Sequence, residues 1–372
     1  MAGDRRLSTS YTGTNAPAQD TQLEVPHGHA YLFGDGTAAV SAPSGKALNR
    51  RRTVRPVGCA GKHGRPAPFS LRSEIRSMTV VPLRAARVYR SENAERSVHA
   101  WCHKTLSQWP ELGPLPPVQT RLGSTQVFRA EGGPGTPVLV LSGVNFSAAT
   151  TVSAARVLAK DRPVYLVDPP GQPGLSHGQR LGGARTEAYG AWLDELLPQI
   201  TDEPVIVLGH SRGAATALAS TPSSRVAGLL LLNPAGLTAA GLSSESMWAT
   251  LSWMLHPNEH TSGKLVACLK GPGADVGGVE CRAEAEWLTL VARHCRTGSM
   301  PHPLNAEFFR AWAGCPITVA TGSHDRYFSP ARLHGPARRF LDAKVRTIEG
   351  AGHLSLHEQP DEVREFLRGF DA

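Results

Sequence analysis

The chain has 372 residues, of which 41% are hydrophobic, enough for a sizeable core in one or two domains. Its formal net charge is +8, but residues 1–77 hold 11 Lys/Arg against 5 Asp/Glu, which leaves 28 against 26 for residues 78–372. We therefore expect no folded nucleic-acid-binding surface, which would need clustered cations and stacking aromatics. No run of about 18 or more apolar residues occurs, so no membrane span is expected either.

Residues 1–77 are rich in Gly, Pro, Ser, Thr, Arg and Ala and lack a sustained apolar period. Such a segment buries too little apolar surface to offset its ordering entropy, so we predict a disordered basic tail. It contains Arg5-Arg6 but not the apolar stretch of a secretory signal. Two alternatives stay open. Translation could begin at Met78, or the arginines at 50–52 could bind a membrane or nucleic acid.

The cysteines are scattered and include no C-x-x-C pair; they stand at positions 59, 102, 268, 281, 295 and 315. Without a signal peptide, this pattern is typical of free thiols in a reducing cytoplasm, where we expect the protein to act as a monomer or a homodimer. Cys268 and Cys281 could bridge a loop, although nothing in the sequence requires it.

The first folded piece is predicted as an N-terminal helical segment, residues 78–118. Its apolar residues recur at helical spacing between Ser91 and Trp109. His99, Cys102 and His103 share one face of this helix and could mimic a metal pair. Because no acidic third ligand lies beside them, packing and solvent exposure are the favoured interpretation.

Strand-like segments then recur, separated by helical ones. Ser124–Ala130 alternates like an antiparallel edge strand. Pro137–Leu141 and Pro163–Val167 are continuous apolar runs, typical of parallel strands covered on both faces. Further strands are predicted at Val205–Leu208, Val226–Leu232, Ile317–Thr321 and Lys344–Ile348. Strands alternating with helices predict an α/β fold with a mostly parallel, doubly wound sheet, built from residues 119–235 and 313–372.

Residues 236–312 interrupt this alternation, because they contain no convincing buried strand. Helical patterns are predicted at Ser244–Leu255, Ala283–Arg293 and Asn305–Trp312. An insertion of this size predicts a helical cap over the carboxyl edge of the sheet. It contains four tryptophans that could line a pocket or form the cap's own core: Trp248, Trp253, Trp287 and Trp312.

The most informative motif is Gly209-His-Ser-Arg-Gly213, a G-x-S-x-G sequence between an apolar strand and an Ala-rich helix. The tight turn strains the serine backbone, and the two glycines avoid Cβ clashes with the neighbouring chain. We therefore predict that Ser211 lies above the sheet at a helix N-terminus, as a nucleophile would.

A serine nucleophile needs a base and a group that orients the base. Asp325 and His353 follow two later strands, so loops can bring both to the carboxyl edge of the sheet. His353 would take the serine proton and return it to the leaving group. Asp325 would hold the imidazole tautomer and stabilise the imidazolium.

With these motifs the chain resembles the α/β-hydrolase fold superfamily, in particular cap-bearing bacterial esterases, over about residues 120–370. Three further segments carry the likeness: Ser142-Gly-Val-Asn145, Asp168-Pro-Pro-Gly-Gln-Pro-Gly-Leu-Ser176, and Gly352-His353 with Glu358 and Pro360. The resemblance implies that the backbone N–H groups of Arg212 and Val144 hold the oxyanion. Ser142 stands where the family usually has histidine, which could alter how this loop is braced.

Several other residues could be functional. His210 is expected to pack beside the turn, and His324 and His357 to be surface or bracing residues. Asp168 is a rival acid by type, but its loop precedes the nucleophile strand and should be structural. Asn233 stands where some relatives have the acid, and an amide cannot serve equally.

Two further groups could bind a metal ion or a substrate. His256, Glu259 and His260 resemble a metal cluster, although Pro257 argues against a regular helix face. The Arg212 side chain could attract a substrate carboxylate, but a structural role is favoured.

The predicted protein is a serine hydrolase that cleaves a small or medium ester through an acyl-enzyme, with no metal or organic cofactor. A carbon–carbon-bond hydrolase or a thioesterase would use the same residues. The alternative from another class is a binding protein that keeps the fold without turnover.

Overall fold

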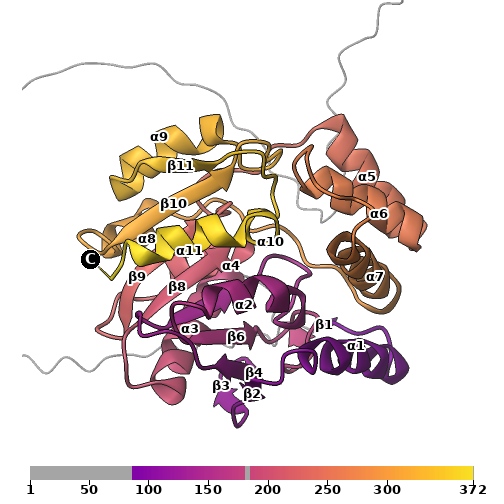
Figure 1. The fold of residues 1–372 in the computed structure, drawn as a ribbon, viewed down its shortest axis with the longest axis horizontal. Helices are drawn as coiled ribbons and strands as arrows, with labels where there is room; N and C mark the ends of the chain where they lie inside the picture. Colours follow the sequence, from indigo (N-terminus) through magenta and orange to yellow (C-terminus); the bar gives the residue numbers. More distant parts are fainter. Residues whose placement is uncertain (1–85, 181–184, 372) are drawn as a thin grey trace, which may run out of the picture. The chain divides into compact units, whose positions relative to one another are not determined.

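The computed structural model describes residues 86–180 and 185–371 (Figure 1). The predicted tail, with Met78 and the arginines at 50–52, lies outside these residues, and so does the beginning of the predicted segment 78–118. Among the five cysteines that the structure describes, all are free thiols, including Cys268 and Cys281.

Within the described residues, the main sheet has nine strands in the order β11-β10-β9-β8-β5-β6-β4-β2, with β3 paired to β4. Their bounds are β2 Leu112–Pro114, β3 Val118–Thr120, β4 Gly123–Ala130, β5 Val138–Leu141, β6 Val164–Asp168, β8 Val205–His210, β9 Val226–Leu232, β10 Ile317–Gly322 and β11 Val345–Ile348. Neighbours from β6 to β11 pair in parallel, and β4 is antiparallel to β6. The predicted mostly parallel sheet is confirmed.

A separate two-stranded antiparallel ribbon joins β1, Ala86–Arg87, to β7, Gln179–Arg180. The helices run along both sides of the main sheet and beyond its edge. Their bounds are α1 Glu92–Leu106, α2 Val152–Leu158 after the short 3₁₀ turn Ala149–Thr151, α3 Arg185–Ile200, α4 Arg212–Ala219, α5 Ser244–Leu255, α6 Glu259–Leu269, α7 Val279–His294, α8 Ala306–Ala311, α9 Pro330–Leu341, α10 Ser355–Glu358 and α11 Pro360–Arg368.

The central parallel strands β5, β6 and β8 are buried on both faces, and alternate residues enter two cores. Val138 and Val140 of β5 join the core formed with α1, α2 and α11. Leu139 and Leu141 join the core formed with α3, α4 and α9. This is why the strands are continuous apolar runs rather than alternating ones.

The edge prediction for Ser124–Ala130 was wrong. The strand, β4, is antiparallel as expected, but it lies between β6 and β2 and also pairs with β3. The outer strand β2 is only three residues long and contains Pro114, so it has no strand pattern of its own. The segment predicted as helical over 78–118 therefore contains α1 and, after it, sheet residues.

The region predicted as a cap, residues 236–312, contains four helices and no named strand. Helices α5, α6 and α7 pack against one another, whereas α8 packs against α4 and α9 on a face of the sheet. Figure 1 shows α5, α6 and α7 as one group beside the sheet. Helix α6 was not predicted from the sequence. Trp253, Trp287 and Trp312 are buried, and Trp248 is 67% exposed.

Candidate active site

Ser211 occupies the turn between β8 and α4, with φ of 52° and ψ of −111°. A Cβ at Gly209 would lie 2.5 Å from the Ala214 nitrogen, and one at Gly213 would lie 2.1 Å from the Leu141 oxygen. Only glycine fits at either position. The predicted turn geometry is therefore present, with the serine at the N-terminus of α4.

The structure brings Ser211, His353 and Asp325 together from the ends of three strands. His353 Nε2 lies 3.0 Å from Ser211 Oγ, and His353 Nδ1 lies 3.0 Å from Asp325 Oδ2. With Nδ1 as the donor to the carboxylate, Nε2 is free to accept the serine proton. All three residues are at least nine-tenths buried.

Asp325 is held by more than the histidine. Its Oδ1 accepts the N–H groups of Tyr327 and Phe328 at 2.8 and 3.0 Å. Its Oδ2 also accepts the side-chain amide of Asn233 at 2.8 Å. Burial alone would raise the pKa of Asp325, but His353 and these donors lower it to about 2. The carboxylate therefore stays charged beside the imidazole.

Asn233 and His210, which the sequence singled out without a catalytic role, both position the histidine loop. Asn233, at the end of β9 with φ of 48°, also donates to the Gly352 carbonyl oxygen at 3.1 Å. His210 Nε2 lies 2.7 Å from the His353 carbonyl oxygen, so this nitrogen must be the donor. Burial, and to a lesser degree His353, lower the pKa of His210 to about 3, which keeps its ring neutral. Both side chains hold the loop that carries His353.

The C-terminal end of α6 contacts the same loop. The His353 N–H donates to the Leu269 carbonyl oxygen at 2.6 Å. Glu358 accepts the N–H groups of Gly271 and Gly352 at 2.7 and 2.8 Å. One carboxylate thus joins a helix of the inserted region to the histidine loop.

The loop after β5 lies beside the serine. A Cβ at Gly143 would be 3.4 Å from Ser211 Cβ. Asn145 has φ of 63°, and its oxygens accept the Trp287 indole N–H at 2.8 Å and the Gly298 N–H at 3.1 Å. Ser142 donates to the Ser147 carbonyl oxygen at 3.3 Å, so a serine braces this loop internally. The loop that contains Val144 is therefore fixed from both sides.

Asp168, the alternative candidate for the acid, joins two loops by hydrogen bonds. Its two carboxylate oxygens each accept one backbone N–H at 2.7 Å, from Ala148 and from Leu175. A Cβ at Gly174 would lie 2.5 Å from its Cγ. Burial raises the pKa of Asp168 to about 6, although the two N–H groups partly oppose this. Its position is structural, as predicted.

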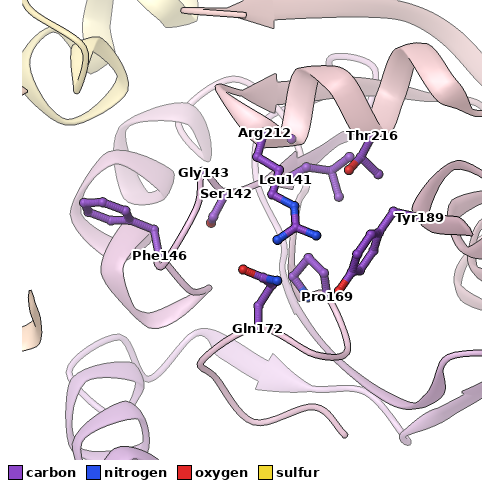
Figure 2. Close-up of a pocket in the computed structure, with 10 residues that line it drawn as sticks. Leu141, Ser142, Gly143, Phe146, Pro169, Gln172, Tyr189, Arg212 and Thr216 are labelled. Carbon is purple, nitrogen blue, oxygen red and sulfur yellow. The ribbon is translucent and has the colours of Figure 1, made fainter. Parts of the chain in front are cut away.

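The Arg212 side chain points away from the serine turn into a cavity that Figure 2 shows. Its guanidinium carbon lies 4.4 Å from the centre of the Tyr189 ring. Gln172 and Phe146 also line this cavity. The volume is about 10 Å³, room for about one water molecule. The cavity is therefore too small to admit the carboxylate group of a substrate.

Of the remaining histidine candidates, His357 lies beside His210, with 6.4 Å between the ring centres. His324 is exposed, and His357 Nδ1 lies 3.1 Å from Glu284 Oε1. Over residues 86–180 and 185–371 there is no group of three or more His, Cys, Asp or Glu side chains that could hold a metal ion. In the same ranges no helix has both the length and the apolar character needed to cross a membrane.

The fold is that of an α/β hydrolase. A model described as "Alpha/beta hydrolase family" matches residues 138–366. The chain belongs to this family, and we class it as a hydrolytic enzyme. A search of curated protein sequences returned no match.

Solved structures of similar fold include three from Bacillus subtilis. The naproxen esterase (carboxylesterase NP) has a TM-score of 0.60 and 21% identity, covering 73% of this chain and 95% of its own. Carboxylesterase CesB has a TM-score of 0.60 and 17% identity, with 75% and 98% covered. A third hydrolase has a TM-score of 0.63 and 20% identity, with 75% and 99% covered. At these identities the likeness shows a shared fold.

Proposed function

We propose that the protein is a carboxylesterase-like serine hydrolase with Ser211 as nucleophile, His353 as general base and acid, and Asp325 as the orienting acid. The observation that carries the proposal is the unbroken chain of 3.0 Å contacts from Ser211 through His353 to Asp325. In the resting state the serine proton points to Nε2, and the opposite nitrogen donates to a charged carboxylate.

In the first step, Ser211 Oγ attacks the ester carbonyl carbon while His353 accepts its proton. The tetrahedral oxyanion would be held by the backbone N–H groups of Arg212 and Val144. Arg212 begins α4, so its N–H lies at the positive end of a helix. Each such donor is typically worth ~2.7–4 kcal/mol of barrier height.

Collapse of this intermediate expels the alcohol, which takes the proton from His353 and leaves an acyl-serine. Water then enters, gives a proton to His353 and attacks the acyl carbon. The second collapse releases the acid and returns the proton to Ser211. Asp325 stays charged throughout, because its hydrogen bonds and His353 lower its pKa to about 2.

Helices α5, α6 and α7 are proposed as the cap that limits access to this centre. Helix α6 contacts the histidine loop, and α7 contacts the loop of Val144 through Trp287. A small or medium ester is the proposed substrate class. The free thiols of the described cysteines favour action in a reducing cytoplasm.

A panel of p-nitrophenyl esters with increasing acyl length tests this proposal. We expect the wild type to hydrolyse the short and medium esters, and Ser211→Ala to lose roughly 10⁴-fold or more in kcat while keeping its circular dichroism and melting temperature. Ser224→Ala, which changes an exposed serine in the turn before β9, serves as the matched control. Equal rates for the wild type and Ser211→Ala would overturn the proposal.

A further inference from the structure

Helix α5 carries an apolar face that nothing in the described chain covers. Eight large apolar side chains are exposed among the described residues, and five of them belong to this one helix. They are Met247, Trp248, Leu251, Met254 and Leu255, which are 44–67% exposed, and we call them the α5 stripe. Leu242, just before the helix, is 71% exposed and extends the group.

The spacing of these five residues places them on one side of the helix. Positions 247, 248, 251, 254 and 255 fall within about 120° of arc at 100° per residue. The opposite side is anchored, because Ser246 and Trp253 are buried and the Trp253 indole donates to the Leu288 carbonyl oxygen at 2.8 Å. Helix α5 is thus attached by one face and presents a second apolar face outward.

The exposed apolar area of this surface lies at the upper end of what a monomer usually exposes. At on the order of 100 Å² each, the stripe and Leu242 expose roughly 600 Å² of apolar area, the upper end for the largest patch on a monomer. A standard protein interface buries about 800 Å² per partner. The stripe with its polar margin is therefore large enough to be the core of an interface.

The amino-acid composition of α5 favours a protein partner over a lipid surface. Helices that lie on membranes carry Lys and Arg on their polar side, and α5 contains neither. Its single charged residue, Glu245, pairs with Arg326, so the margin is neutral. Trp and Met side chains with no charged group among them are typical of protein interface cores.

We propose that the α5 stripe is a self-association surface, at which two copies of this chain pack their α5 helices against each other about a two-fold axis. A two-fold interface requires a surface that is complementary to itself. An uncharged apolar stripe meets this requirement in an antiparallel helix pair, because it brings no like charges together. The 12-residue helix offers a contact about 18 Å long.

Sedimentation velocity of the full chain across a range of concentrations tests this proposal. At micromolar concentration, we expect the sedimenting species of the wild type to have twice the mass of the 39.7 kDa chain. The double variant Trp248→Glu/Leu251→Glu should weaken association at least 100-fold, with an unchanged far-ultraviolet spectrum and melting temperature. Leu255→Lys, at the end of the stripe, should weaken it by a smaller factor.

Val279→Glu is the matched control, because Val279 is 74% exposed and lies outside α5. It should leave the dimer intact. A wild type that stays monomeric up to about 100 μM would overturn the proposal. So would a dimer that the double variant leaves unchanged.

Vesicles of phosphatidylcholine with phosphatidylglycerol test the alternative that the α5 stripe binds a lipid surface. Pelleting of a monomeric wild type with these vesicles, lost in the double variant, would assign the stripe to lipid and overturn self-association. Persistence of the dimer in the presence of vesicles supports it.

Discussion

Asp168 and Asp325 occupy equivalent places at the carboxyl edge of the sheet but have opposite properties. Asp168 ends β6, and Asp325 follows β10; both are at most 2% exposed. Burial raises the pKa of Asp168 to about 6, with two backbone N–H groups opposing it. For Asp325 the same burial is outweighed by His353, backbone N–H groups and Asn233, and its pKa falls to about 2.

The difference shows that the neighbouring groups, rather than burial, determine the roles of these two carboxylates. Asp325 faces an imidazole and keeps its charge, so it can stabilise an imidazolium. Asp168 accepts only backbone N–H groups and joins two loops.

Asp325→Asn should have the largest effect. The amide can stabilise the wrong tautomer of His353 and cannot stabilise the imidazolium, so kcat should fall roughly 10⁴-fold. Steady-state kinetics on a short p-nitrophenyl ester measures this, and Asp168→Asn is the matched control. We expect the control to lose less than about 10-fold. A larger loss for the control than for Asp325→Asn would reverse the two roles.

Asp168→Asn should change how stability depends on pH. The folded pKa of about 6 lies above the ordinary value of 3.8, so the wild type loses stability as the pH rises between these values. The loss from this group amounts to about 3 kcal/mol. Urea unfolding from pH 4 to 7 should show this component in the wild type and not in Asp168→Asn. Parallel profiles for the two proteins would contradict it.

Asp325 should change the pH dependence of stability in the opposite direction. Its folded pKa of about 2 lies below 3.8, so its contribution of about 2 kcal/mol is present above pH 4 and is lost as the pH falls through 2. Thermal unfolding between pH 5 and 2 should therefore show a smaller acid-induced loss for Asp325→Asn than for the wild type. An equal loss in both proteins would show that this carboxyl keeps its ordinary pKa.

The sheet and the three residues of the proposed triad could be predicted from the sequence, because each stands beside a local pattern. Ser211 lies between an apolar strand and a helix, and Asp325 and His353 follow strands directly. The contacts of His210 and Asn233 could not be predicted in this way. The partner carbonyl of His210 lies 143 positions away, and that of Asn233 lies 119 away.

Helix α6 was missed because its apolar residues are interrupted by Gly263 and Lys264. A signal was nevertheless present. The Asn258 side-chain oxygen accepts the Thr261 N–H, and the Thr261 hydroxyl oxygen accepts the Asn258 N–H. Such a cap marks the start of a helix that apolar periodicity alone does not reveal.

Labelling with a fluorophosphonate probe, followed by peptide mapping, tests the central claim most directly. A phosphonate reacts only with a serine that is activated by its base and supported by an oxyanion site. We predict stoichiometric labelling of the wild type on the peptide that contains Ser211, unchanged labelling of Ser224→Ala, and none for Ser211→Ala. Folded wild-type protein that stays unlabelled, or that is labelled at another serine, would contradict Ser211 as the nucleophile.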